Sequence, residues 1–313
     1  MHAFAAALFV FAIIAQQALA QEGRNTRPIT KPLVFASQAE KDAYDEKTKP
    51  TGDGKIAGKT PPLNNAGRSM VKIRAHIIGG NRASRGELPW IVGLVLNSAS
   101  FCGGSLITQG AVLTAAHCAK KVKKFTVYIG MQNYGSKTET GRVVMTATRR
   151  VVHKGFSKAM LENDIAIIKL PKKVTIGQYI NTVKLPTYSD VTNKFVGTKA
   201  TIAGWGLTSD TSGISKELNV LTDREVITNS ECAQTYGEIA NSMLCISGSD
   251  EKAICSGDSG GPLTYMDSTG ANVQIGIVSF SHPSSCIGYP QVFTRVSSYL
   301  KFISVNTGLR IKN

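Results

Sequence analysis

Downstream of residue 77 the chain consists of short apolar runs of strand length, separated by segments that contain Gly, Asn, Ser and Pro. Examples of such runs are Ile91–Leu96, Phe125–Ile129, Ile165–Leu170, Thr198–Ala203 and Gln274–Phe280. Many short strands with frequent turns are typical of an antiparallel β-sandwich or barrel. The pattern therefore predicts an all-β fold. Residues 296–303 are different, because their apolar side chains recur at helical spacing and predict a C-terminal helix that packs on the body.

A second feature is a serine in a turn of small residues. Residues 257–262 read Gly-Asp-Ser-Gly-Gly-Pro, so the neighbours of Ser259 let backbone N–H groups approach a reacting carbonyl. A serine hydroxyl is a poor nucleophile at neutral pH and needs a base to take its proton. His117, within Thr-Ala-Ala-His-Cys, and Asp164, within Asn-Asp-Ile-Ala-Ile-Ile-Lys-Leu, supply an imidazole and a carboxylate. Each of these residue types is more often structural when alone, so the prediction of catalysis depends on all three.

These segments, in the order His, Asp, Ser, resemble the chymotrypsin-like (trypsin/chymotrypsin) family of serine endopeptidases. The resemblance covers residues 77–305 and includes further segments: Ile77-Ile78-Gly79-Gly80, Cys102-Gly103-Gly104-Ser105-Leu106, Ala203-Gly204-Trp205-Gly206 and Ser279-Phe280. It implies two antiparallel β-barrels with the active site in the cleft between them. It also implies protein or peptide substrates and serine protease inhibitors as partners of a monomer. No acidic calcium loop lies between residues 130 and 142, so we expect no metal and no other cofactor.

The resemblance assigns a role to each residue of the site. Ser259 would attack the scissile carbonyl while His117 takes its proton, and Asp164 would orient the imidazole with Ser279 as its support. The backbone N–H groups of Gly257 and Ser259 would hold the oxyanion. Water would then hydrolyse the acyl-enzyme.

The resemblance further implies a zymogen that an activating protease cleaves before Ile77. The freed ammonium of Ile77 would pair with Asp258, so the uncleaved precursor is expected to be latent. The residue before Ile77 is His76, where most relatives have Arg or Lys, and Arg74 lies two positions upstream. Either the activator accepts histidine, or cleavage after Arg74 is followed by trimming.

The specificity pocket departs from trypsin-like relatives. Ala253 stands six residues before the nucleophile, where those relatives carry an aspartate. Ser281 and Gln291 stand at wall positions that are glycine in trypsin and chymotrypsin. The bulk of Gln291 would narrow the pocket, and its amide could bond a substrate. We expect a chymotrypsin- or elastase-like preference for small to medium apolar residues.

Residues 1–76 lie outside the resemblance, which makes residues 77–313 the protease domain. Residues 1–20 read as a secretory signal that ends in Ala18-Leu19-Ala20; a membrane anchor is the alternative, but the apolar run is shorter than about 20 residues. Residues 21–76 are polar and lack cysteine, which predicts a disordered propeptide, with a plain linker as the alternative. No later segment is long and apolar enough to span a bilayer, so we expect a secreted, extracellular protein.

All six cysteines lie after residue 77, and secretion makes disulfides their expected state. Spacing alone leaves many pairings open. The family resemblance implies the pairs Cys102–Cys118, Cys232–Cys245 and Cys255–Cys286. A metal site is disfavoured, because no Cys-x-x-Cys pair with matching ligands appears.

The formal net charge of the chain is +15, and its densest basic cluster is the loop Lys120-Lys121-Val122-Lys123-Lys124. A basic loop beside a cleft would suit acidic substrates or a polyanion such as a glycosaminoglycan, although a solvated loop is the simpler interpretation. No aromatic residues interleave with the lysines, so nucleic-acid binding is not expected.

Two other functions compete with that of an endopeptidase. One is a catalytically inactive protease homologue that acts as a binding protein, and the other is a polyanion-binding protein that uses the barrels as a scaffold. Retention of His117, Asp164 and Ser259 argues against an inactive homologue.

Overall fold

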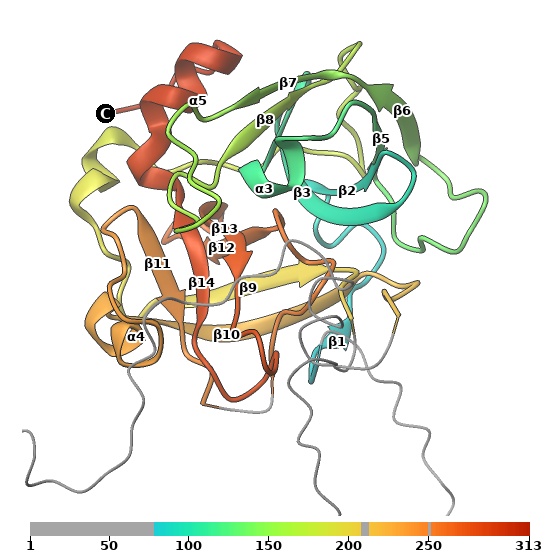
Figure 1. Ribbon diagram of the computed structural model, residues 1–313. Helices are drawn as coiled ribbons and strands as arrows, with labels where there is room; N and C mark the ends of the chain where they lie inside the picture. The colour runs from blue at the N-terminus through green and yellow to red at the C-terminus, as the bar shows by residue number, and fades with distance from the viewer. Residues whose placement is uncertain (1–77, 208–212, 250–251) are drawn as a thin grey trace, which may run out of the picture. The chain divides into compact units, whose positions relative to one another are not determined.

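Two antiparallel sheets of seven strands each form the framework of the protein (Figure 1). The structure is a computed structural model that describes residues 78–207, 213–249 and 252–313. The expected signal peptide (1–20), the expected propeptide (21–76) and Ile77 lie outside these described residues.

The first sheet comes from the N-terminal half of the described chain, and its strand order is β6-β5-β2-β3-β4-β8-β7. Its strands are β2 (Ile91–Leu96), β3 (Ser100–Thr108), β4 (Ala111–Thr114), β5 (Phe125–Ile129), β6 (Val143–Ala147), β7 (Arg149–Val152) and β8 (Ala166–Lys169). The edge strands β6 and β7 are separated along the chain by Thr148 alone. Because one residue joins them, the adjoining ends of β6 and β7 lie close together and the sheet curls into a half-barrel, which we call the first barrel and in which these two strands do not pair with each other.

The second sheet closes through hydrogen bonds. Strand β9 pairs with β12 on one side and with β10 on the other, so six strands form a complete barrel, and β1 pairs with β10 outside that ring. The strands are β1 (Asn81–Arg82), β9 (Lys199–Gly204), β10 (Asn219–Ile227), β11 (Met243–Ile246), β12 (Pro262–Met266), β13 (Asn272–Phe280) and β14 (Gln291–Arg295). The fold is therefore the two-barrel arrangement expected from the sequence.

The helices are short. They are α3 (Ala116–Ala119), η1 (Tyr188–Thr192), α4 (Asn229–Tyr236), η2 (Val296–Tyr299) and α5 (Leu300–Thr307). Helix α4 begins with a capping box, in which the Thr228 hydroxyl accepts from the Glu231 N–H and the Glu231 carboxylate accepts from the Thr228 N–H. Helix α5 ends at Gly308, whose left-handed conformation is typical of a helix C-terminus. Among the described residues, no helix is long and apolar enough to cross a membrane.

The C-terminal helix joins the barrels. Tyr299, Leu300 and Ile303 are buried in the same apolar cluster as strands β2 and β4 of the first barrel. The helix thus follows directly from the second barrel but packs on the first (Figure 1). The spacing of residues 296–303 predicted a C-terminal helix packed on the body, and the structure has one, although residues 296–299 form the 3₁₀ turn η2 and the sequence did not indicate which barrel the helix contacts.

Candidate active site

His117 lies on α3, a single helical turn that follows β4 and faces the second barrel. Its neighbours Ala116, Cys118 and Ala119 are buried, which anchors the turn and leaves the imidazole 15% exposed. A disulfide from Cys118 to Cys102 of β3 ties the turn to the sheet behind it. The imidazole is therefore held on a rigid support.

Asp164 lies just before β8 and is fully buried. Its Oδ2 atom is 2.7 Å from Nδ1 of His117, and its Oδ1 atom accepts the backbone N–H of His117 at 2.8 Å. The hydroxyl of Ser279, on β13 of the second barrel, donates to Oδ2 at 2.7 Å. Three donors therefore satisfy a carboxylate that would otherwise be costly to bury.

The protonation state of His117 follows from this contact. Burial lowers the pKa of His117, but the charge of Asp164 and the hydrogen bond to it outweigh burial, so the pKa is raised above its ordinary value of 6.5. Because Nδ1–H donates to Asp164, the neutral ring keeps its lone pair on Nε2. The geometry thus provides a base whose tautomer is fixed.

Ser259 lies on the turn before β12, and this turn packs directly against the first barrel. The N–H of Gly103 on β3 donates to the Ser259 carbonyl at 2.8 Å. Gly260 has a φ of 80°, and a Cβ atom there would lie 2.2 Å from the Thr114 hydroxyl, so a larger residue would push the turn away. Only glycine permits this close approach of the two barrels.

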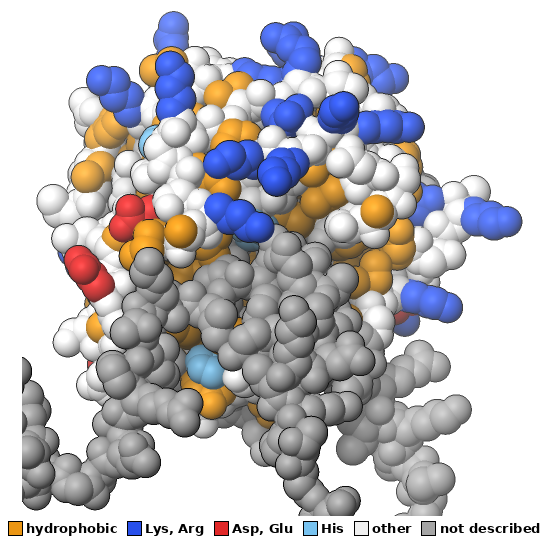
Figure 2. All heavy atoms as spheres, in the orientation of Figure 1, with side chains coloured by type: hydrophobic (Ala, Val, Ile, Leu, Met, Phe, Trp, Pro, Cys, Tyr) orange, Lys and Arg blue, Asp and Glu red, His pale blue; other side chains and the backbone are white. Residues whose placement is uncertain are grey.

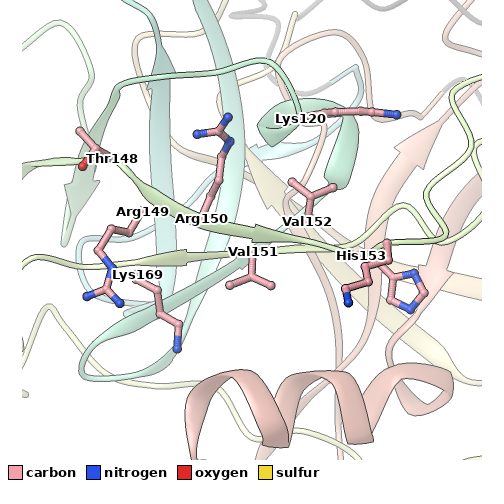
Figure 3. A pocket seen from close by; sticks show the side chains of 9 residues that line it. Lys120, Thr148, Arg149, Arg150, Val151, Val152, His153 and Lys169 are labelled. Carbon is pink, nitrogen blue, oxygen red and sulfur yellow. The ribbon is translucent and has the colours of Figure 1, made fainter.

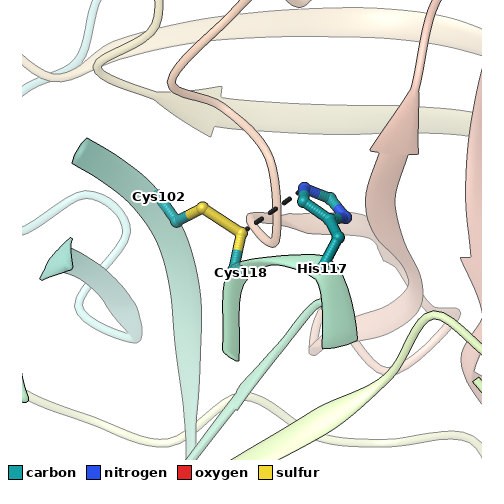
Figure 4. Close-up of side chains that lie close together, drawn as sticks. All are labelled: Cys102, His117 and Cys118. Atoms are coloured by element: carbon teal, nitrogen blue, oxygen red, sulfur yellow. Dashed lines mark hydrogen bonds between the residues drawn. A yellow bond between two sulfur atoms is a disulfide. The ribbon is translucent and has the colours of Figure 1, made fainter. Parts of the chain in front are cut away.

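A single sulfur atom lies between the imidazole and the serine turn. The Sγ atom of Cys118 is 3.5 Å from Nε2 of His117 and 3.6 Å from the Ser259 carbonyl oxygen (Figure 4). His117 and Ser259, which are far apart in the sequence, therefore flank the same atom.

Two backbone donors next to the serine have no backbone acceptor. Within the part of the chain that the structure describes, neither the N–H of Gly257 nor that of Ser259 donates to a carbonyl group of the backbone. Gly257 has a φ of 100°, a conformation that side-chain-bearing residues rarely adopt. Both N–H groups are thus available to a bound oxyanion.

Asp258 points away from the serine into a cradle of backbone groups. It is fully buried, its Oδ1 atom accepts the Gly206 N–H at 2.8 Å, and its Oδ2 atom accepts the Cys255 N–H at 3.0 Å. A Cβ atom at Gly206 would lie 2.2 Å from Oδ2, so that position admits no side chain. Burial raises the pKa of Asp258 to about 6, although the two hydrogen bonds lower it.

Two of the three predicted pocket residues, Ala253 and Gln291, lie beside a disulfide between Cys255 and Cys286. Ala253 is buried in the same cluster as this disulfide, whereas Ser281 is partly exposed. Gln291 is fully buried on β14, where its Oε1 atom accepts the Ile254 N–H at 3.2 Å and its Nε2 atom donates to the Cys286 carbonyl at 3.3 Å.

This arrangement differs from the expectation that the Gln291 amide is free to bond a substrate. Gln291 is fully buried, and its amide oxygen and nitrogen each bond a backbone group, one on each side of the disulfide. Gln291 therefore acts as a brace between the segments at Ile254 and Cys286.

The structure contains the three disulfides that the resemblance implies, namely Cys102–Cys118, Cys232–Cys245 and Cys255–Cys286. Cys102, His117 and Cys118 cluster closely enough to hold a metal ion (Figure 4). A cysteine binds a metal as a thiolate, however, and the sulfurs of Cys102 and Cys118 are bonded to each other. The donor chemistry of this cluster does not suit a metal.

Sequence reasoning missed two contacts of the site. The Thr294 hydroxyl on β14 donates to the Asp164 carbonyl at 2.8 Å, which gives Asp164 a second link to the second barrel. The Ile78 carbonyl accepts the N–H of Ala253 at 3.1 Å, so the chain next to Ile77 lies against the pocket segment. Neither contact leaves a local sequence signal, because the partners are more than 100 residues apart.

Comparisons with known proteins match the same region. A family model described as Trypsin matches residues 77–303. Brachyurin of Leptuca pugilator is 38% identical over 235 residues, which are 74% of this chain and 99% of that relative. Chymotrypsin of Phaedon cochleariae is 35% identical over 252 residues, which are 80% of this chain and 87% of that relative. A solved structure of HL collagenase superposes with a TM-score of 0.67 and 36% identity, and the match covers 75% of this chain and 100% of that chain.

Proposed function

This chain belongs to the trypsin family of serine endopeptidases, and we propose that it cleaves peptide bonds through an acyl-enzyme at Ser259. His117 takes the proton of the Ser259 hydroxyl as that oxygen attacks the scissile carbonyl, and then gives it to the leaving amine. Water attacks the acyl-enzyme in the second half-reaction, with His117 again as the base. Asp164 orients the imidazole and stabilises the imidazolium.

The environment of Asp164 is the observation that carries this proposal. A buried carboxylate that accepts from the ring and the backbone of His117, and from Ser279, fixes one tautomer of the imidazole. Only that tautomer presents a basic Nε2 toward the side on which the Ser259 turn lies.

The N–H groups of Gly257 and Ser259, which donate to no backbone carbonyl among the described residues, support an oxyanion hole at the same turn. Charge develops on the substrate oxygen only as the tetrahedral intermediate forms, so these donors stabilise the transition state more than the substrate. One such donor lowers the barrier by roughly 3–4 kcal/mol.

Activation would depend on Asp258. This carboxylate is buried, and its pKa is raised to about 6. Cleavage before Ile77 would create an ammonium group one residue from Ile78, which already lies against the pocket segment at Ala253. We infer that Ile77 pairs with Asp258 and thereby orders the turn of residues 257–259. The precursor, with residues 21–76 as its propeptide, would be latent.

The pocket favours apolar side chains. Ala253 brings no charge to its base, and Gln291 fills space between its walls with an amide that backbone groups occupy. A substrate Lys or Arg would therefore leave its charge unpaired in a buried site, which is costly. Small to medium apolar residues fit this environment better.

The three disulfides fit an extracellular protein, which supports secretion through a signal at residues 1–20. The protease domain would then begin at Ile77 and continue to Asn313. N-terminal sequencing tests the signal cleavage after residue 20 in the secreted precursor and the activating cleavage before Ile77 in the mature form. A mature N-terminus other than Ile77 would contradict the activation scheme.

The proposal is tested by labelling with a serine-reactive phosphonate. The protein trimmed to Ile77 should be labelled rapidly, the full-length precursor slowly and the Ser259→Ala variant not at all. Cleavage of a peptide mixture by the trimmed protein then reports specificity. Equal labelling of the Ser259→Ala variant would refute Ser259 as nucleophile, and cleavage mainly after Lys or Arg would refute the apolar pocket.

A further inference from the structure

The two barrels carry very different charges. Residues 78–184, which contain every strand of the first barrel and also β1 of the second sheet, include 16 Lys and Arg but only 4 Asp and Glu. Residues 185–313 contain 9 Lys and Arg and 11 Asp and Glu. On the face shown in Figure 2, Lys and Arg side chains gather over the region that the first barrel and α5 occupy in Figure 1. The positive charge of the described chain is therefore concentrated on one barrel.

An open hollow of about 680 Å³ lies on the surface of this basic barrel, along strand β7. Five cationic side chains line it, and no carboxylate does: Lys120, Arg149, Arg150, Lys154 and Lys169. In Figure 3 Lys120 and Arg150 lie above β7, whereas Arg149 and Lys169 lie below it. We call this hollow the β7 groove.

The cations of the β7 groove have no acidic partner of their own. None of the five forms a salt bridge with a residue that the structure describes. Two of them are nevertheless held in place, because the ammonium of Lys169 donates to the Asn306 carbonyl of α5 and that of Lys120 lies 5.1 Å from the centre of the Phe156 ring. Like charges repel each other, so five cations that line one hollow without a carboxylate among them favour an anionic ligand.

Edge-strand protection explains only part of this pattern. Strand β7 is an edge of the first sheet, and cations on an edge strand prevent pairing with another chain. That role accounts for Arg149 and Arg150 but not for Lys120, which belongs to the turn after α3, or for Lys169 on the inner strand β8. Lys154, in the turn after β7, is likewise outside the edge strand, so cations from four segments line one hollow.

We propose that the β7 groove binds a sulfated polysaccharide. Arginine presents a planar fork of donors that suits a sulfate group, and the flanking lysines add charge without demanding one geometry. The basic surface continues beyond the groove to the exposed lysines Lys121, Lys123 and Lys124, so the matching ligand is a chain with many anionic groups rather than a single ion. The lysine loop predicted from the sequence is an extension of this site, to which it contributes only Lys120.

Other polyanions fit the β7 groove less well. No Phe, Tyr or Trp lines it, so it lacks the rings on which the bases of a single-stranded nucleic acid would stack. An acidic peptide would cover the groove but would leave the rest of the basic barrel unmatched. His117, Asp164 and Ser259 do not line the groove, so binding there is separate from catalysis and independent of the proposed mechanism.

The test is the anisotropy of a fluorescent heparin octasaccharide titrated with the full-length protein, at low and at physiological salt. Arg149→Gln/Arg150→Gln should weaken binding by about tenfold, and higher salt should weaken it further. The control Lys194→Gln/Lys216→Gln removes the same charge from exposed positions outside the groove, and should change the affinity less than about twofold. An equal loss of affinity in the two double variants would refute the β7 groove as the binding site, since net charge alone would then explain binding.

A second pair, Lys120→Gln/Lys154→Gln, lies outside β7 and tests the groove without altering an edge strand. It should also bind the octasaccharide several-fold more weakly, with an unchanged melting temperature. Competitors identify the ligand class: desulfated heparin should not compete. If duplex DNA or poly-glutamate of equal charge competes better than heparin, the assignment to a sulfated polysaccharide is wrong.

Discussion

Asp258 should make the stability of the uncleaved precursor fall as the pH rises. This carboxyl group is fully buried, and its described partners are the N–H groups of Gly206 and Cys255. Burial raises its pKa from 3.8 to about 6 in spite of these two bonds. In the unfolded chain the same group is hydrated and ionises at its ordinary pKa.

The sign and size of the effect follow from linkage. Between pH 3.8 and about 6 the folded protein keeps the Asp258 proton, whereas the unfolded chain has released it. The folded state therefore binds more protons, and the free energy of unfolding decreases as the pH rises through this window. This pKa shift corresponds to roughly 3 kcal/mol in the free energy of unfolding, and the whole contribution is lost above about pH 7.

Urea unfolding of the precursor from pH 4 to pH 7.5 measures this loss, with Asp258→Asn as the matched variant. His117 also titrates near this range, and its raised pKa likewise makes stability fall as the pH rises. The difference between the wild-type and Asp258→Asn curves removes that contribution. Asparagine cannot accept both N–H groups, which adds a penalty that does not vary with pH.

The cleaved protein supplies the deciding comparison. If the Ile77 ammonium pairs with Asp258, the pKa of the carboxyl group falls and the decrease in stability between pH 4 and pH 7 disappears. Parallel curves for the wild-type precursor and Asp258→Asn would refute the role of burial. A decrease that persists after cleavage would refute the pairing.

Three further predictions concern the catalytic residues and the pocket. Asp164→Asn should lower kcat on a short peptide ester by about 10⁴-fold, because asparagine stabilises the wrong tautomer of His117; a loss below tenfold would contradict the triad. The raised pKa of His117 should place the acid limb of the kcat/KM profile above pH 6.5, since only the neutral ring accepts a proton, and a limb below 6.5 would contradict the Asp164 contact. Gln291→Gly should cost about 1–3 kcal/mol in urea unfolding and admit larger apolar residues in a cleavage profile, because it removes the brace between Ile254 and Cys286. An unchanged cleavage profile would show that Gln291 does not set the size of the pocket.

The sequence predicted the fold well where the pattern is local. The runs Ile91–Leu96 and Phe125–Ile129 are strands β2 and β5 with the same bounds, and the other three expected runs differ from β8, β9 and β13 by one or two residues at their ends. Strand length and alternation are properties of adjacent residues, so they can be read from the sequence. The closure of the second barrel through β9 and β10 involves no such signal.

The site was predicted less completely than the fold. The contact of His117 with Asp164 and that of Asp164 with Ser279 were expected from the resemblance, and both pairs lie within hydrogen-bond distance. The burial of the Gln291 amide was not expected, because composition and spacing do not reveal which backbone groups lack a partner. The β7 groove escaped notice for a similar reason, since its lysines and arginines come from segments that only the fold brings together.

The candidate active site is also the joint between the two barrels. Asp164 belongs to the first barrel, but the hydroxyls of Ser279 and Thr294 in the second barrel both donate to it. Conversely, the N–H of Gly103 in the first barrel donates to the Ser259 carbonyl of the second. Helix α5 adds an apolar contact across the same joint, because it follows the second barrel in the chain and packs on the first. A shift between the barrels would therefore break the support of the carboxylate and move the serine turn in one step. Hence the packing that holds the barrels together also sets the position of the proposed catalytic groups.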